Sequence, residues 1–301
     1  MSPPSCAVHD RRDRSSVNSS PEVGSAARFA FGANWSRFLA TVTEEQIVQA
    51  ERSLREMLGL QSLEGQRFLD VGSGSGLFSL AARRLGAVVH SFDFDSDSVA
   101  CTQELRRRHF PDDAQWKVEQ GSILDRSYLD SLGTFDVVYS WGVLHHTGAM
   151  WLAIEYAIGR VATGTGRLWV AIYNDQGWKS HLWWFVKRLY NLLPRPVRPA
   201  FVLATSFITR ILVVVKYTLK LEPMTAIRPL LSRRRERGMS GKFDDVDWIG
   251  GFPYEFAQFE TLLAYFLARG FSLINSRRST SLGCHELVLR QTGSTPTGGI
   301  D

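Results

Sequence analysis

Short apolar runs alternate with helical stretches from Arg67 to Asn174, and this alternation limits the fold of the 301-residue chain more than any other feature. The expected strands lie at 67–71, 88–93, 116–119, 135–140 and 166–173. Helical stretches, clearest at 98–108 and 151–161, separate them. Because a strand, a helix and a second strand in succession form a βαβ unit, the pattern predicts a parallel sheet with helices on both faces.

The same rhythm returns near the C-terminus, with a helix at 259–268 and strands at 271–274 and 286–289. The Ser/Arg/Gly-rich connection between these two strands is too short to hold a crossover helix, so they form an antiparallel hairpin. The predicted fold class is therefore α/β. It is a Rossmann-like seven-stranded sheet with a C-terminal antiparallel hairpin and helices on both faces, plus a helical insert.

Six segments follow from this pattern. A polar, Pro/Ser-rich tail at 1–27 is expected to be disordered, and its lack of an apolar core argues against a signal peptide. Next come an N-terminal helical lid (28–66), whose capping box begins at Thr43, and the ligand-binding core. The core is expected at 67–174 and is followed by a helical insert that forms a substrate lid at 175–248. The completion of the sheet is expected at 249–291, and a second tail at 292–301.

Composition excludes several classes of protein. Hydrophobic residues make up 44% and charged residues 22%, which argues against a disordered, collagen-like or membrane-bundle chain. Cys6, Cys101 and Cys284 are too few and too scattered for a disulfide framework, so a cytoplasmic location is expected. The net charge is +5, with arginine clusters at 106–108 and 233–237 that fit either solvated helix faces or attraction to anionic lipid or nucleic acid.

The run 200–221 is the most apolar in the chain. Ser206, Thr209, Lys216 and Lys220 are spaced so that they form a polar stripe along one side of a helix. Arg210 and Lys216 would each cost about 2.5–3.5 kcal/mol at a bilayer centre. A helix packed on the domain is therefore favoured over a membrane span, and peripheral membrane contact stays open as the alternative.

The segment from Asp70 to Gly76, Asp-Val-Gly-Ser-Gly-Ser-Gly, lies between the first strand and its helix. Glycines at 72, 74 and 76 allow a backbone with positive φ to approach a ligand closely. Asp70 is placed to accept from an ammonium group or to order the loop. Asp93 ends the second strand, where a carboxylate binds the two hydroxyls of a ribose. A hydrolase nucleophile elbow is excluded because Gly74 stands where the serine is needed.

At this point the sequence resembles the class I S-adenosylmethionine (SAM)-dependent methyltransferases. The resemblance covers Arg67 to Asn174 and, more loosely, 250–289. It is carried by Phe-Leu-Asp-Val-Gly-Ser-Gly-Ser-Gly at 68–76, Ser-Phe-Asp at 91–93, Gly-Ser-Ile-Leu-Asp at 121–125 and Phe-Asp-Val-Val-Tyr-Ser-Trp-Gly-Val-Leu-His-His at 135–146. The expected cofactor is S-adenosyl-L-methionine, and 67–174 is then its binding core.

The resemblance implies a role for each matching residue. Gly72, Gly74 and Gly76 would lie against the amino-acid end of SAM, with Asp70 nearby, and Asp93 would hold the ribose. Ser122 and Ile123 would border the adenine. Ser140 and Trp141 would flank the methionine portion near the sulfonium.

Candidate catalytic residues follow the fourth and fifth strands. A hydroxyl or phenol acceptor needs a general base, and His145 or His146 would serve because histidine titrates near neutrality. Tyr173 and Asn174 are expected to orient the acceptor or to form a polar pair in the core. No metal is expected, since adjacent histidines point in different directions and no Asp/Glu/Cys cluster accompanies them.

The acceptor is expected to be a small molecule that reacts at a hydroxyl or a phenol/quinol oxygen. Within the family, the likeness is to bacterial small-molecule O-methyltransferases, including quinone-biosynthesis types, although the insert departs from their pattern. The insert contains five aromatic residues that suit an aromatic or lipidic acceptor or, equally, pack the lid against the core: Trp178, Trp183, Trp184, Phe185 and Tyr190. Two alternatives stay open: a nucleic-acid methyltransferase, disfavoured because no Asn-Pro-Pro-Tyr-like motif follows the fourth strand, and a SAM-binding protein without transfer activity.

Overall fold

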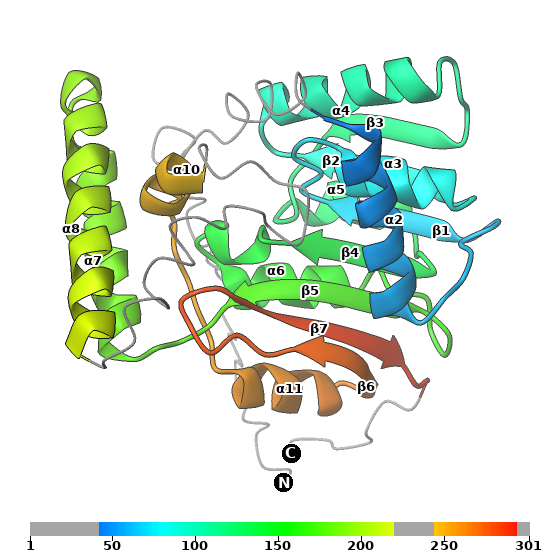
Figure 1. Cartoon of the computed structure of the whole chain (residues 1–301). Coiled ribbons are helices and arrows are strands. Elements are labelled where there is room, and N and C mark those ends of the chain that lie inside the picture. Colours follow the sequence, from blue (N-terminus) through cyan, green and yellow to red (C-terminus); the bar gives the residue numbers. More distant parts are fainter. Residues whose placement is uncertain (1–41, 220–243, 294–301) are drawn as a thin grey trace, which may run out of the picture.

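Seven strands form one mixed sheet in the order β3-β2-β1-β4-β5-β7-β6 (Figure 1). The computed structural model describes residues 42–219 and 244–293. The strands are β1 Arg67–Val71, β2 Val88–Asp93, β3 Trp116–Gln120, β4 Val137–Trp141, β5 Arg167–Tyr173, β6 Phe271–Arg277 and β7 Cys284–Gln291. β7 runs antiparallel to both β5 and β6, and all other pairs are parallel. The predicted parallel sheet with a C-terminal antiparallel hairpin is confirmed.

The strand boundaries differ by more than one residue from the expected ones in β4 and in the hairpin strands β6 and β7. β4 begins at Val137 because Phe135 forms an isolated bridge with Val161 instead of joining the sheet. Both hairpin strands are longer than their apolar runs, and a register shift between Leu273 and Asn275 interrupts their pairing. The polar residues that extend them are paired through the backbone, which an apolar pattern does not show.

Nine α-helices and two short 3₁₀ helices are named within the described residues. The α-helices are α2 Glu44–Leu58, α3 Leu77–Arg84, α4 Ser96–His109, α5 Arg126–Leu132, α6 Met150–Ile158, α7 Trp178–Leu192, α8 Arg198–Leu219, α10 Asp244–Gly250 and α11 Phe259–Leu267. The 3₁₀ helices are η2 Leu144–His146 and η3 Arg195–Val197. α5 was not expected from the sequence, and it is capped by the Asp125 side chain, which accepts from the Tyr128 N–H.

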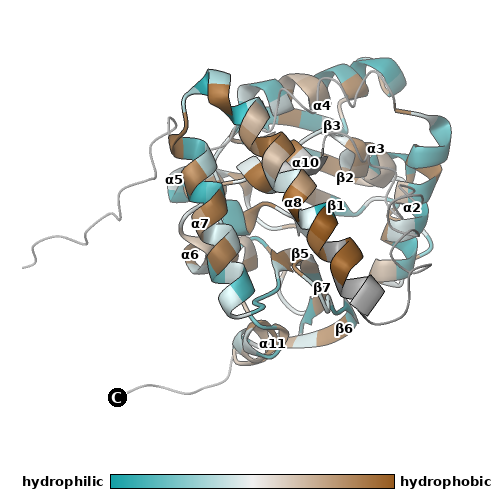
Figure 2. Ribbon diagram, turned by 60° about the vertical axis from the view of Figure 1, so that its left-hand side comes forward, coloured by the Kyte–Doolittle hydropathy of each residue, from teal (hydrophilic) through white to brown (hydrophobic). Residues whose placement is uncertain are grey.

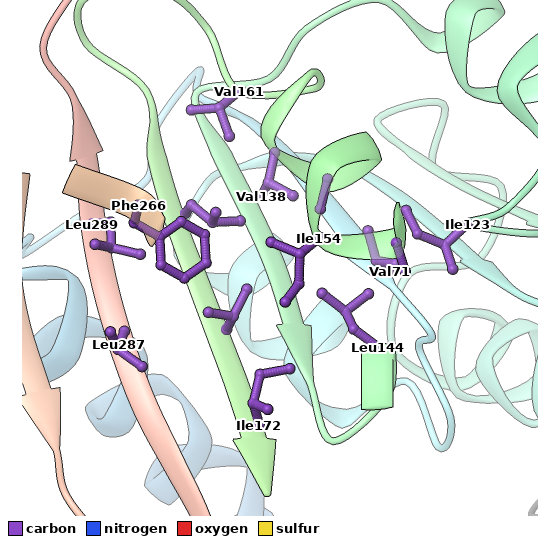
Figure 3. Close-up of a cluster of buried hydrophobic side chains, with 14 of the residues drawn as sticks. Val71, Ile123, Val138, Leu144, Ile154, Val161, Ile172, Phe266, Leu287 and Leu289 are labelled. Carbon is purple, nitrogen blue, oxygen red and sulfur yellow. The ribbon is translucent and has the colours of Figure 1, made fainter. Parts of the chain in front are cut away.

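Two apolar clusters fill the spaces on either side of the sheet. One joins the sheet to α2, α3 and α4, with Leu54, Leu80 and Leu105 among its members. The other joins it to α5, α6 and α11 (Figure 3), where Ile154, Phe266 and Leu287 pack together. The burial of these faces leaves the carboxyl edge of the parallel strands as the place where loops can form a site.

α2 forms one of these layers instead of covering the carboxyl edge. Thr43 and Gln46 form the expected capping box, and Gly59 ends the helix in a left-handed conformation. Ile47, Leu54 and other apolar residues of α2 pack into the cluster shared with α3. The helical part of the expected N-terminal lid is therefore a layer of the domain, and residues 28–41 lie outside the described residues.

α7, α8 and α10 lie beyond the carboxyl edge of the parallel strands (Figure 1). The described part of the insert (175–219 and 244–248) is largely helical as expected, and α7 ends before Pro194. The helix expected within 200–221 is α8, and it contacts α10 and, through Phe201, Tyr190 of α7, but its apolar face is not packed on the domain. Leu203 and Phe207 of α8 are 73% and 63% exposed, since the half-buried side of the helix includes Ser206 and Thr209.

Within the described residues, no helix has the length and hydropathy of a membrane span. Of the two arginine clusters, Arg107 and Arg108 both pair with Glu104 and so belong to a solvated helix end. The cluster at 233–237 lies outside the described residues.

Candidate functional site

The loop after β1 turns sharply because three of its residues have a left-handed backbone. The φ angles of Gly72, Gly74 and Gly76 are +77°, +56° and +78°, which residues with a Cβ rarely adopt. A Cβ at Gly72 would lie 2.4 Å from Cγ2 of Val143, in the loop after β4. The loops after β1 and β4 therefore pack directly against each other at the point where the order of the strands reverses.

Asp93 ties this loop to the end of β2. Its Oδ2 accepts from the Gly74 N–H at 2.9 Å, and its Oδ1 accepts from the Asp95 N–H at 2.9 Å. Burial raises the pKa of Asp93 to about 6, although these backbone donors oppose the shift. The structure thus brings together two elements that the sequence predicted separately.

Asp70 belongs to a buried hydrogen-bond network with Ser79 and Ser91. Its Oδ2 accepts from the Ser79 hydroxyl at 2.5 Å, and Ser79 is in turn bonded to Ser91 at 2.7 Å. Burial, with a smaller contribution from the charge of Asp93, raises the pKa of Asp70 to about 7. Of the two roles expected for Asp70, this network performs the ordering of the loop, because it fixes α3 behind the glycines.

The loop after β3 reaches the same edge. The Gly121 N–H donates to the Asp93 carbonyl at 3.0 Å, which places Ser122 beside the end of β2. Ile123 is buried in the cluster between the sheet and α6 (Figure 3). Phe94, 39% exposed, follows Asp93, and its carbonyl accepts from the Gln120 side chain. Phe94 was not among the site residues predicted from the sequence. The sequence feature that could have indicated it is an aromatic residue directly after the acidic residue that ends a strand.

Ser140 and Trp141 occupy the end of β4. Ser140 is fully buried, and its hydroxyl donates to the Val71 carbonyl at 3.2 Å, so it fastens β4 to β1. Trp141 is partly buried against the cluster shared with α2 and α3. Of this pair, Trp141 is the one whose side chain is not fully buried.

His145, His146 and Tyr173 form one aromatic cluster. The rings of His145 and Tyr173 are 4.1 Å apart, and those of His145 and His146 are 4.5 Å apart. His145 is completely buried, whereas His146 is partly exposed. Nδ1 of His146 lies 2.6 Å from the Pro253 carbonyl, to which it must donate because a carbonyl only accepts. His146 Nε2 is then the unprotonated nitrogen of the neutral ring.

Lys187 of α7 is buried beside this cluster and was not predicted from the sequence. Its ammonium group donates to the Trp248 carbonyl and lies 4.4 Å from the centroid of the Trp248 ring and 4.8 Å from that of Tyr254. Burial, with a smaller contribution from the charge of Lys187, lowers the pKa of His146 to about 3. The pKa of His145 is also well below its usual range, chiefly through burial.

The side chain of Asn174 makes its hydrogen bonds within the fold. Its side chain donates to the Ser279 and Ser281 carbonyls and pairs with His285, which fastens β5 to the hairpin loop. The aromatic residues of the insert are divided by the two sides of α7. Trp183 packs against Trp248, whereas Trp178 and Phe185 point away from the domain and are 71% and 58% exposed.

Part of this chain is similar in sequence to known methyltransferases. Residues 69–168 match the family described as methyltransferase domain. The chain is 35% identical over 85 residues to the ribosomal protein L11 methyltransferase of Pediococcus pentosaceus, a match that covers 24% of this chain and 27% of that protein. The chain thus spans about a quarter of the length of the curated relatives it matches.

Solved structures of methyltransferases share the fold over most of the chain. Magnesium protoporphyrin IX methyltransferase from Synechocystis PCC 6803, with bound SAH, has a TM-score of 0.50 at 14% identity, covering 86% of this chain and 94% of that chain. An O-methyltransferase family protein from Burkholderia thailandensis has a TM-score of 0.51 at 12% identity, covering 88% and 60%. The chain therefore shares the fold of these solved methyltransferases.

Proposed function

We propose that this chain, which carries a methyltransferase domain over residues 69–168, transfers a methyl group from SAM to a hydroxyl or phenol oxygen of a small molecule. One observation carries the proposal. The loop with positive φ at three glycines is hydrogen-bonded to Asp93 at the carboxyl edge, where sheets of this kind bind nucleotides.

The residues at this edge fit such a cofactor. The two oxygens of Asp93 accept from the Gly74 and Asp95 N–H groups, and because a carboxylate has about four lone-pair positions, acceptor capacity remains for the ribose hydroxyls. Phe94 and Ser122 lie beside Asp93 and would border the adenine. Gly72, Gly74 and Gly76 would lie along the amino-acid end of SAM, and Trp141 would flank its methionine portion.

When bound, SAM supplies a methyl group that its sulfonium already activates, so the protein chiefly has to align the acceptor and exclude water. His146 would accept the proton of the acceptor hydroxyl at Nε2, because Nδ1 is held by Pro253. A ring with a pKa of about 3 is a weak base. Proton transfer would therefore accompany methyl transfer rather than precede it.

Lys187 and Tyr173 would complete the acceptor side. The buried ammonium of Lys187 favours an acceptor oxygen that gains negative charge as its proton leaves. Tyr173 packs against both histidine rings and holds their orientation. The charge of Lys187 thus supports an oxygen acceptor over a neutral amine.

The test is incubation of the full chain with isotopically labelled SAM and a panel of phenols, quinols, lipids and sugars, read by mass spectrometry. We expect a labelled methyl ether from one class, and a loss of about 100-fold or more in kcat for His146→Ala with SAM affinity retained. Asp97→Asn, on the exposed start of α4, is the matched control. Transfer only to nitrogen, to carbon or to RNA would contradict the acceptor proposed here.

A further inference from the structure

α7 has the reverse of the usual distribution of side chains. Its buried residues are Ser180, Lys187 and Tyr190. On the opposite side, large apolar residues recur at spacings of 4, 3, 4 and 3 and are exposed: Trp178, Leu182, Phe185, Leu189 and Leu192. A helix that only packed on the domain would turn this stripe inward, since burial of apolar surface drives packing.

α8 repeats the same reversal. Its exposed side chains include seven large apolar residues on one broad face, namely Leu203, Phe207, Ile208, Ile211, Leu212, Val214 and Val215. These residues and the α7 stripe form what we term the outer face. With Val197 between the helices, it holds thirteen of the twenty large hydrophobic residues that are exposed in the described part of the chain. Figure 2 shows that hydrophobic residues dominate along the ribbon of α8. A patch of this extent marks an interaction site.

The charges around the outer face have one sign. From Gln176 to Leu221 the sequence holds eight Lys and Arg residues and no Asp or Glu. Lys187 is buried, but Lys179 and Arg188 border the α7 stripe and Arg210 borders the α8 face, all three exposed. Two copies of this face would bring positive charges together, which disfavours self-association. An anionic lipid surface complements both the charge and the apolar area.

We propose that the outer face of α7 and α8 docks this protein onto the surface of an anionic phospholipid bilayer. The helices lie parallel to the membrane with their apolar side chains below the headgroups and their basic side chains among them. No other described element stands beyond α8 on this side (Figure 1), so the domain does not obstruct the contact. Docking does not require methyl transfer and is tested apart from it.

The experiment is co-sedimentation of the full chain with vesicles of phosphatidylcholine, with and without phosphatidylglycerol. Binding is expected to be at least about tenfold tighter to the anionic vesicles and to weaken as salt rises. Phe207→Glu and Leu182→Glu should each reduce that binding at least about tenfold. Val48→Glu, which places the same charge on an exposed apolar residue of α2, should leave it unchanged.

Three results would overturn the docking. They are equal binding to neutral and anionic vesicles, equal loss in Val48→Glu and Phe207→Glu, and a dimer in sedimentation velocity that Phe207→Glu dissociates while vesicles bind neither form. Affinity for S-adenosylhomocysteine, measured by calorimetry on each variant, separates this failure from that of the proposed function, because neither substitution lies near Asp93.

Discussion

The main-chain N–H of Gly74 donates a 2.9 Å hydrogen bond to Oδ2 of Asp93, so the glycine loop and the end of β2 are one connected unit. A substitution in the loop is therefore expected to shift the Asp93 carboxylate, and a substitution of Asp93 is expected to shift the loop. This coupling determines which variants separate folding from ligand binding.

Gly72→Ala is expected to destabilise the protein strongly. The new Cβ would meet Val143, and the φ of +77° would cost about 1–2 kcal/mol in addition. With overpacking at about 1–3 kcal/mol, the free energy of unfolding should fall by roughly 3 kcal/mol in urea denaturation.

Gly142→Ala separates the two causes of that loss. Gly142 also has a positive φ, +76°, but a Cβ there meets nothing within 4 Å. This variant should lose only the backbone contribution, about 1–2 kcal/mol. Equal losses in the two variants would show that contact with Val143 is unimportant.

Asp70 should make stability fall as pH rises. Its pKa is about 7 in the folded protein and near 3.8 in the unfolded chain, so the folded state holds a proton that the unfolded state has lost between those values. The carboxyl group costs nothing below pH 3.8, and its cost grows up to pH 7 by about 1.4 kcal/mol per unit of pKa shift. The relevant quantity is the difference in urea midpoint between the wild type and Asp70→Asn.

That difference should favour Asp70→Asn increasingly from pH 4 to pH 7 and then level off. Comparison of the two proteins removes the contribution of the buried histidines, whose lowered pKa values act in the opposite direction. A difference that does not change with pH would contradict the raised pKa of Asp70.

Lys187→Met should raise the pKa of His146. The charge of Lys187 opposes the imidazolium form, and its removal leaves burial as the remaining cause of the low value. Titration of the imidazole by NMR is expected to show an upward shift that still ends below 6.5, together with reduced kcat. Lys179→Met, exposed on the same helix, should change neither, and an unshifted His146 would contradict the electrostatic link.

The fold was predictable because its determinants are local. The apolar runs at Arg67–Val71 and Val88–Asp93 became strands with the same bounds, and Gly72 has the positive φ that its position implied. Lys187 was not predictable. Trp248 and Tyr254, which enclose it, come some sixty residues later in the chain, and a lysine within a helical pattern ordinarily faces solvent.

α8 shows a second limit of sequence reasoning. The spacing of Ser206 and Thr209 correctly predicted a helix with a polar stripe along one side and hence an apolar face opposite it. It did not indicate what covers that face, because an apolar stripe reads the same whether it packs on the domain or lies exposed. Tertiary structure alone showed the stripe turned outward.

Calorimetric titration of the purified full chain with S-adenosylhomocysteine measures whether Asp93 and the glycine loop bind the nucleoside of SAM. We predict saturable binding at one site, weakened about tenfold to a hundredfold in Asp93→Asn, because charged hydrogen bonds to the ribose contribute about 1.5–3 kcal/mol. Wild-type affinity should also fall below pH 6, as Asp93 becomes protonated. A folded wild-type protein that shows no heat of binding, or an Asp93→Asn variant that binds as tightly as the wild type, would contradict the account.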